Sequence, residues 1–305
     1  MGFRFRKRLP HHSRPVDQPF QERRLAIGAV HVSNCSGRSP VNEVPSSRTL
    51  GVEECYLMYN TDDHWKQWGQ QDPYFAVLSH KKFRKENIEA NRKEFFESGA
   101  EYVFGIIATV VRHFGQLNNE SALDFGSGVG RLTIPLGERF KKVVGVEISD
   151  AMIAEARQNC QHFGAWNVDF VKSDDDLSWL AQKFDFVNSC LVLQHLAPNR
   201  GMNIISRLLK SLNPGGVIAL HFPVRRRLPP LEQFVYVLKH NVPCARYCFN
   251  LLQGRRFSEP LMQMNQYDLI EVAALYSANG IREFTFNTYV LEGTLSVILF
   301  GRKEA

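Results

Sequence analysis

A glycine-rich loop with an acidic residue on either side is the part of this sequence best suited to chemistry. The loop follows the apolar segment 122–125 and consists of Gly126, Ser127, Gly128, Val129 and Gly130. Glycines let the chain turn sharply and let a ligand touch the main chain, and the helix expected over 131–140 offers free N–H groups at its start. Glu147 ends the next apolar run, where a carboxylate is well placed to accept both hydroxyls of a ribose. The stretch 122–147 therefore predicts a strand, a ligand-binding loop, a helix and a second strand.

The spacing of the glycines separates two classes of ligand. A dinucleotide fingerprint, Gly-x-Gly-x-x-Gly, requires its third glycine at position 131, which holds Arg131. Asp124 stands just before the loop, where a negative charge repels a pyrophosphate but suits an ammonium or sulfonium group. The loop is therefore better suited to a positively charged ligand than to a nicotinamide dinucleotide.

The pattern Asp-x-Gly-x-Gly-x-Gly, with an acidic end to the next strand, resembles motif I of the class I S-adenosylmethionine-dependent methyltransferases. The resemblance is strong over 120–225 and loose over 265–303. It implies S-adenosylmethionine as cofactor, with Asp124 at the methionine amine, Glu147 at the ribose diol and Asp174 at the adenine amino group. It further implies cofactor contacts from Gly126, Ser127, Gly128, Gly130, Ile148, Asp175 and Cys190. Asp174 has an alternative role, because an aspartate before a short helix often caps that helix.

The segment from Cys190 to His195 resembles motif IV of the same superfamily. Some O-methyltransferases bind a divalent metal there through Glu-x-x-Glu-His, but this chain has Leu191 and Gln194 at the acidic positions, so we expect no metal. His195 is the candidate general base, and His221 is a second one. A structural role is the alternative for both histidines.

Strands and helices alternate along the chain after residue 120. The expected strands are 122–125, 143–147, 168–171, 184–189 and 217–222, and the expected helices between them are 131–140, 150–163, 177–182 and 198–212. This alternation predicts βαβ units and a parallel sheet with right-handed crossovers. A helix at 266–279 and strands at 281–288 and 295–300 follow. The resemblance then implies an α/β, Rossmann-like fold: a seven-stranded, mostly parallel sheet with one antiparallel edge strand and helices on both faces.

Charge and composition divide the 305 residues further. Residues 1–50 hold nine Lys or Arg and three acidic residues, and their net charge of +6 equals that of the whole chain. We expect residues 1–57 to be a disordered basic extension, 58–118 an aromatic and helical cap with helices at 83–96 and 97–114, and 119–305 the methyltransferase domain. Within that domain, 223–266 reads as a lid-like insert.

The composition also bears on partners and location. The charges balance after residue 50, so we expect no nucleic-acid partner. No apolar run reaches the length of a membrane span, so we expect no membrane partner either. Six scattered cysteines indicate reduced thiols and a cytoplasmic protein.

The predicted function is methyl transfer from S-adenosylmethionine to a small-molecule or glycan-precursor acceptor. Five arginines in the insert suit an anionic acceptor, although a solvated basic loop is an alternative reading; they are Arg225, Arg226, Arg227, Arg255 and Arg256. Two further functions stay open. One is an NAD-dependent oxidoreductase, and the other is an inactive cofactor-binding scaffold that uses 223–266 as an interface.

Overall fold

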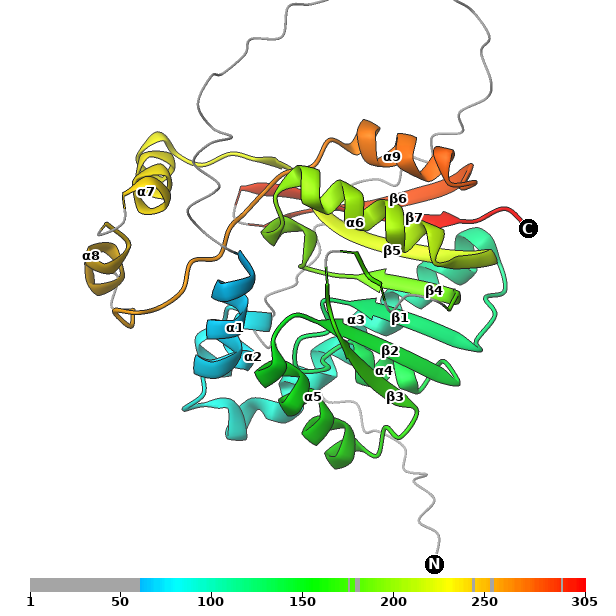
Figure 1. Ribbon diagram of the computed structural model, residues 1–305, viewed down its shortest axis with the longest axis horizontal. Helices are drawn as coiled ribbons and strands as arrows, with labels where there is room; N and C mark the ends of the chain where they lie inside the picture. Colours follow the sequence, from blue (N-terminus) through cyan, green and yellow to red (C-terminus); the bar gives the residue numbers. More distant parts are fainter. Residues whose placement is uncertain (1–60, 175, 179–181, 243–244, 253–254, 292) are drawn as a thin grey trace, which may run out of the picture.

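A seven-stranded sheet forms the centre of the molecule (Figure 1). The computed structural model describes residues 61–174, 176–178, 182–242, 245–252, 255–291 and 293–305. The strand order is β3-β2-β1-β4-β5-β7-β6. The strands are β1 (Ser121–Phe125), β2 (Lys142–Glu147), β3 (Val168–Lys172), β4 (Phe184–Ser189), β5 (Leu212–Arg226), β6 (Glu283–Leu291) and β7 (Thr294–Arg302). The predicted α/β fold with a mostly parallel seven-stranded sheet is confirmed.

The position of the antiparallel strand differs from the prediction. Strand β7 runs antiparallel to both of its neighbours, β5 and β6, and it lies between them rather than at the edge. Strand β6 therefore takes the edge first, and the chain then reverses so that β7 lies between β6 and β5. The two-residue spacing between β6 and β7 does not by itself say which of them pairs with β5, so the sequence left this order open.

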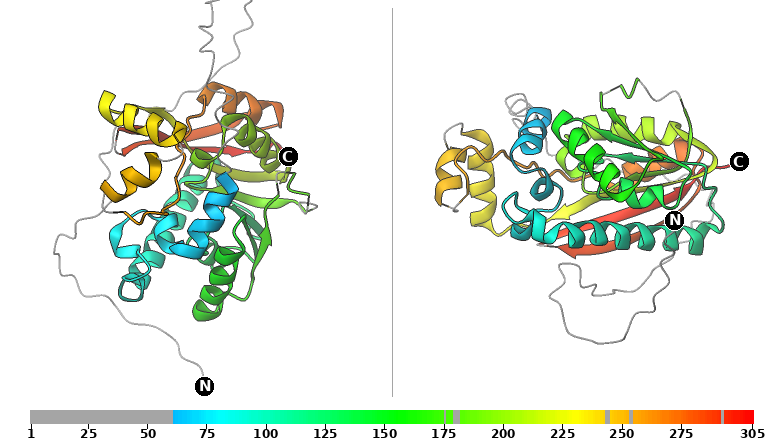
Figure 2. Two further views of the ribbon diagram at one scale, coloured as in Figure 1. Left: turned by 60° about the vertical axis from the view of Figure 1, so that its left-hand side comes forward. Right: turned by 90° about the horizontal axis from the view of Figure 1, so that it is seen from below.

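Helices cover both faces of the sheet because successive side chains of each strand point to opposite sides. Ala122, Val143 and Phe186 belong to one apolar core, packed under α3 (Ile88–Phe114) and α5 (Asp150–Phe163). Leu123, Val144 and Val187 belong to the other, packed under α6 (Pro198–Lys210) and α9 (Leu269–Ala278). Figure 2 shows α3 running along its face of the sheet. The remaining helices are α1 (Thr61–Gln71), α2 (Pro73–Val77), α4 (Thr133–Gly137), α7 (Pro230–Asn241) and α8 (Ala245–Leu252).

Several predicted element boundaries are wrong. The helices expected at 83–96 and 97–114 are one helix, α3, because its buried side, which includes Phe95, Val103 and Val110, continues past residue 97. The helix expected at 131–140 shortens to α4, which ends at Gly137. The strand expected at 217–222 is longer: β5 begins at Leu212 and runs on to Arg226, inside the predicted insert. At 177–182, the described residues 177, 178 and 182 are not helical.

Helices α1 and α2 lie beyond the carboxyl ends of the parallel strands, and α7 and α8 lie farther out on the same side (Figure 1). The predicted basic extension, 1–57, lies outside the described residues. No described helix is both long and apolar enough to cross a membrane. The division into cap, methyltransferase domain and insert stays a prediction.

Candidate functional site

The glycine loop is tied to the end of β2 by its main chain. The amide N–H groups of Gly126 and Ser127 both donate to the carbonyl of Val146, at 2.8 and 2.9 Å. The φ angles of Gly126, Gly128 and Gly130 are +77°, +54° and +88°, a region that residues with a Cβ rarely adopt. The three glycines are therefore required by the turn itself, and their spacing follows from its geometry.

Glu147 closes this turn with its side chain. Its Oε2 accepts the N–H of Gly128 at 3.0 Å, while its Oε1 accepts the N–H groups of Ile148 and Ser149 at 2.8 and 2.9 Å. Burial raises the pKa of this carboxyl, and the three backbone donors oppose that shift. Since each carboxylate oxygen has about two acceptor positions, Oε2 keeps capacity for a further donor. The predicted residues Gly126, Ser127, Gly128, Glu147 and Ile148 thus form one hydrogen-bonded unit.

Asp124 is buried just before the loop, and both of its carboxylate oxygens have partners. Thr133 donates through Oγ1 to Oδ2 at 2.7 Å, and Asn188 donates through Nδ2 to Oδ1 at 2.8 Å. Burial raises the pKa of Asp124, and these two hydrogen bonds lower it. The sequence analysis missed Thr133 and Asn188. Asn188 carried a signal, because it is a polar residue that directly follows the apolar pair Phe186 and Val187 of β4, and it pairs in register with Asp124.

Asp174 has a local role at the end of β3. It is exposed, and it accepts the N–H of Ser178 at 3.0 Å and the hydroxyl of Ser178 at 2.5 Å, which lower its pKa. These contacts close a local turn, but the described residues 177, 178 and 182 are not helical, so Asp174 caps no helix among the described residues. A contact with adenine stays a prediction. Asp175 lies outside the described residues.

The segment after β4 turns sharply at Leu191, whose φ of +61° is unusual for a residue with a side chain. The N–H of Leu191 donates to Nδ1 of His221 at 3.0 Å, so the proton of this neutral imidazole is on Nε2. Burial lowers the pKa of His221 to about 3. Neither nitrogen then offers a free lone pair, which argues against His221 as a general base. Burial raises the pKa of the neighbouring Cys190 thiol to about 11, so this thiol is neutral.

His195 has the opposite tautomer. Its Nδ1 lies 2.7 Å from the carbonyl oxygen of Gln263, which can only accept, so Nδ1 carries the proton and Nε2 holds the lone pair. The side-chain nitrogen of Gln194 lies 3.1 Å from Nε2. Burial lowers the pKa of His195 to about 4, which leaves the ring neutral at physiological pH. The Gln194 amide nitrogen can only donate, so it occupies the Nε2 lone pair, and His195 can act as a general base only after this contact is broken.

Helices α1 and α2 cover the loop directly. A Cβ built on Gly128 would lie 2.6 Å from Cγ2 of Val77, and one built on Gly69 would lie 2.1 Å from Oγ of Ser149. The ring centroids of Trp65 and His195 are 4.7 Å apart. Arg200 of α6 forms a bidentate ion pair with Asp62 of α1, at 2.8 and 2.9 Å. The aromatic residues of this region, including Trp68 and Tyr74, belong to the apolar core.

Buried polar atoms without a partner gather around this turn. Among the described residues, Oγ of Ser127, Oδ1 of Asn188 and Nε2 of His221 are buried and lack a hydrogen bond. Such atoms are rare in native proteins and often mark a place where a ligand or water completes the structure. They come from the glycine loop, β4 and β5, at the edge where open α/β sheets bind their ligands. These unpaired donors and acceptors therefore fit a polar ligand with hydroxyl groups, such as a sugar.

Comparisons with known proteins agree with this geometry. A family described as "Methyltransferase domain" matches residues 122–216. The 23S rRNA (uracil(1939)-C(5))-methyltransferase RlmD of Aeromonas salmonicida is 33% identical over 87 residues, which are 27% of this chain and 20% of that protein. The magnesium-protoporphyrin O-methyltransferase of Synechocystis is 35% identical over 94 residues, 31% of this chain and 41% of that protein.

The solved structures agree on the fold. The crystal structure of magnesium protoporphyrin IX methyltransferase from Synechocystis, with bound SAH, is similar with a TM-score of 0.54 and 21% identity; the match covers 80% of this chain and all of that one. At this identity the likeness concerns the fold alone. This chain also spans only about a fifth of the length of the rRNA methyltransferase. Residues 122–216 thus match the methyltransferase-domain family, within a chain that has the class I S-adenosylmethionine-dependent methyltransferase fold.

Proposed function

We propose that this protein transfers the methyl group of S-adenosylmethionine to a small-molecule or glycan-precursor acceptor. The observation that carries the proposal is the unit formed by the glycine loop and Glu147. It places a carboxylate with spare acceptor capacity 3.0 Å from the loop amide of Gly128, inside the segment that matches the methyltransferase domain. Such a unit fits a ribose. The carboxylate can accept a hydroxyl of the ribose diol, and the loop glycines place no Cβ atoms beside it.

The chain's own residues divide the binding work. Oε2 of Glu147 accepts a ribose hydroxyl, and Oγ of Ser127 gains the partner that it lacks. Gly126, Gly128 and Gly130 offer main chain without Cβ atoms. Asp124 supplies negative charge for the methionine amine, and Ile148, Asp174, Asp175 and Cys190 complete the predicted contacts. When bound, the sulfonium cofactor supplies an electrophilic methyl carbon for an in-line displacement.

The transfer needs alignment and a dry site more than it needs catalytic groups. Val77 covers the loop and Trp65 packs against His195, which excludes water. His195 would accept the proton of the acceptor through Nε2, once the Gln194 amide releases that lone pair. With a pKa of about 4, His195 suits an acceptor that ionises readily or already carries a free lone pair. This acceptor class agrees with the predicted anionic acceptor.

Calorimetric titration of the full chain with S-adenosylmethionine, S-adenosylhomocysteine and NAD tests the cofactor. We expect the first two to bind, and binding of NAD alone would mean that the oxidoreductase reading is correct. Incubation with labelled S-adenosylmethionine and a metabolite extract, with total RNA in a parallel arm, tests the acceptor. Label in small molecules supports the proposal, label in RNA overturns the acceptor class, and cofactor binding without any transfer supports the inactive scaffold.

A further inference from the structure

Helices α7 and α8 expose several apolar side chains, while two of their described polar side chains, Lys239 and Asn250, are buried. The exposed apolar residues form what we call the apolar stripe, which consists of Leu231, Phe234, Val237, Leu251, Leu252 and Phe257. The buried side chains of the same insert include Lys239, Asn250 and Glu259. A helix on a soluble protein normally buries its apolar face and exposes its polar face. Among the described side chains of the insert, large apolar ones are exposed and these three polar ones are buried.

The stripe residues share one side of each helix. Leu231, Phe234 and Val237 recur every three residues along α7, and Leu251 and Leu252 end α8 next to one another. Such spacing keeps side chains within a narrow arc of a helix. Figures 1 and 2 show α7 and α8 projecting as a pair beyond α1 and α2. The stripe therefore lies on a part of the molecule that a flat surface can reach.

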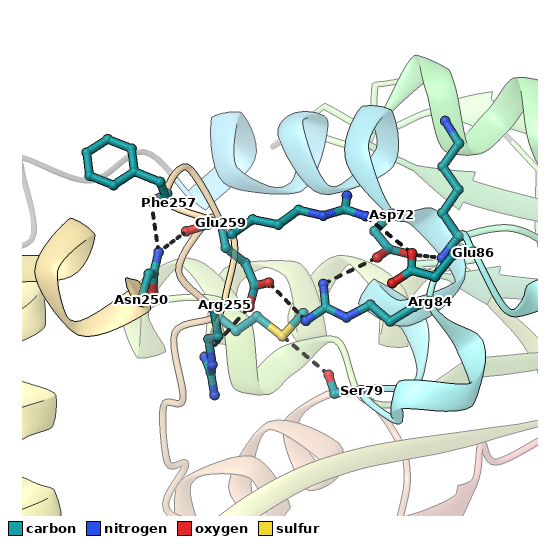
Figure 3. A network of polar contacts seen from close by, with 11 residues as sticks. Asp72, Ser79, Arg84, Glu86, Asn250, Arg255, Phe257 and Glu259 are labelled. Atoms are coloured by element: carbon teal, nitrogen blue, oxygen red, sulfur yellow. Dashed lines mark hydrogen bonds and ion pairs between the residues drawn. The ribbon is translucent and has the colours of Figure 1, made fainter. Parts of the chain in front are cut away.

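The polar interior of the insert fastens it to the cap (Figure 3). Arg84 bridges Asp72, at 3.3 Å, and Glu259, at 2.9 Å. Asn250 donates through Nδ2 to the carbonyl oxygens of Phe257 and Glu259 at 3.2 and 3.0 Å. These contacts attach the insert to the body through polar groups, so the apolar stripe is not needed to hold it there.

Charge is also concentrated in the insert. Residues 223–266 contain seven Lys or Arg and two acidic residues, a net charge of +5, whereas the rest of 51–305 has a net charge of −5. Arg225 and Arg227 are exposed just before α7. Arg255 and Arg256 are exposed just after α8, where Arg255 lies 3.8 Å from Glu259 and Arg256 lies 3.3 Å from Glu86. Basic residues thus stand at both ends of the helix pair that carries the stripe.

We propose that the insert docks on the surface of an anionic lipid bilayer. The apolar stripe would enter the boundary between headgroups and acyl chains, while the flanking arginines pair with lipid phosphates. Helices of 12 and 8 residues are too short to span a bilayer, so they lie at its surface. The sequence analysis expected no membrane partner because it considered spanning segments only. This proposal does not depend on methyl transfer.

Two other occupants of the stripe fit less well. A second copy of this chain, docked through the same face, would bring two surfaces of +5 charge together. A nucleic acid would need aromatic side chains for base stacking, but four of the six stripe residues are aliphatic: Leu231, Val237, Leu251 and Leu252. Only an anionic apolar surface matches both the charge and the side chains.

Vesicle flotation of the full chain tests the proposal with a matched pair of variants. The test variant carries Phe234→Ser and Leu252→Ser, residues that are 63% and 80% exposed. The control carries Phe104→Ser and Ile270→Ser, which have the same exposed fractions, 63% and 80%, but lie on α3 and α9. Neither pair changes the net charge, so binding through the basic N-terminal residues is equal in both.

The vesicles are phosphatidylcholine alone and phosphatidylcholine with about 30% phosphatidylserine. We expect the wild type and the control to bind the anionic vesicles equally. The test variant should bind about tenfold less, because it lacks two apolar side chains that would enter the bilayer. Equal binding by all three proteins, or no binding by the wild type, would overturn the proposal.

Two further readouts separate the other occupants. Light scattering that shows a wild-type dimer, lost only in the test variant, would assign the stripe to a second copy. A shift of RNA in a gel, lost only in the test variant, would assign it to a nucleic acid. Calorimetry with S-adenosylmethionine is run on all three proteins. If the wild type binds the cofactor but does not float with anionic vesicles, only this proposal is overturned. If it floats with the vesicles but does not bind the cofactor, only the proposed function is overturned.

Discussion

The carboxylate of Glu147 accepts the amide N–H of Gly128 at 3.0 Å, so the tip of β2 and the glycine loop form one hydrogen-bonded unit. The same carboxylate also holds the N–H groups of Ile148 and Ser149. A single side chain therefore fixes the loop and the first turn before α5. We therefore expect a ligand of the loop or of this turn to depend on Glu147, which holds both segments in place.

Replacement of Glu147 by alanine should weaken S-adenosylmethionine binding by about 1.5–3 kcal/mol, because the charge-assisted hydrogen bond between Oε2 and a ribose hydroxyl is lost. Glu147→Gln, which keeps the shape and one acceptor oxygen, should lose less. Calorimetry measures both. A change below about threefold for both the cofactor and its demethylated product would contradict the role of Glu147.

Gly128→Val should abolish cofactor binding while the fold survives. The φ of +54° at Gly128 disfavours any residue with a side chain. A Cβ at this position would also lie 2.6 Å from Cγ2 of Val77, which covers the loop. Gly105→Ala is the control, because a Cβ at Gly105 meets nothing within 4 Å. It should raise the free energy of unfolding by roughly 0.5–1 kcal/mol and leave binding unchanged. Cofactor affinity near that of the wild type in Gly128→Val would refute the loop assignment.

Asp124→Ala should abolish cofactor binding and also reduce stability, because it leaves the buried donors of Thr133 and Asn188 without an acceptor. The expected cost is about 1–3 kcal/mol of unfolding free energy. Thr133→Val separates the two effects, since it removes one hydrogen bond and keeps the charge. This control should lose stability yet bind the cofactor. If both variants bind equally well, Asp124 has a structural role only.

The free energy of unfolding should fall as the pH drops from about 6.5 to about 4. The pKa of His195 is lowered from 6.5 to about 4 in the folded protein, so the unfolded chain binds the proton first in this window. Linkage gives a loss of about 3 kcal/mol for this residue alone, and His221, with a pKa of about 3, adds to it. Denaturant unfolding across this pH range measures the slope.

His195→Gln should flatten this slope, and His162→Gln, at an exposed position, serves as its control. An unchanged slope in His195→Gln would show that His195 is not buried as a neutral ring.

A chain that starts at Met58 should fold and bind S-adenosylmethionine as tightly as the full chain. Residues 1–57 have several prolines and no apolar period, so they cannot bury enough surface to offset the entropy of ordering. Limited proteolysis and calorimetry check this expectation. Precipitation of the shortened chain, loss of cofactor binding, or resistance of residues 1–57 to protease would each contradict it.

The sequence by itself determined the fold class and the core of the candidate site. The alternation of strands and helices and the apolar strand residues specify a parallel sheet covered on both faces. Asp124, Gly126, Gly128 and Glu147 could be found because local backbone geometry demands them, and the loop, its glycines and the next strand end are within 24 residues of one another. Local requirements of this kind are written in the spacing of residue types.

Only the tertiary structure decided the contacts between distant segments. The partners of Asp124, the tautomers of His195 and His221, and the cover that Val77 places on Gly128 each join residues more than eight positions apart, which no local pattern encodes. The order of β6 and β7 was open for the same reason. The outward apolar stripe of α7 and α8 was hidden as well. Which side of an amphipathic helix faces the protein depends on what packs against it, and here polar groups such as Arg84 and Glu259 make that contact.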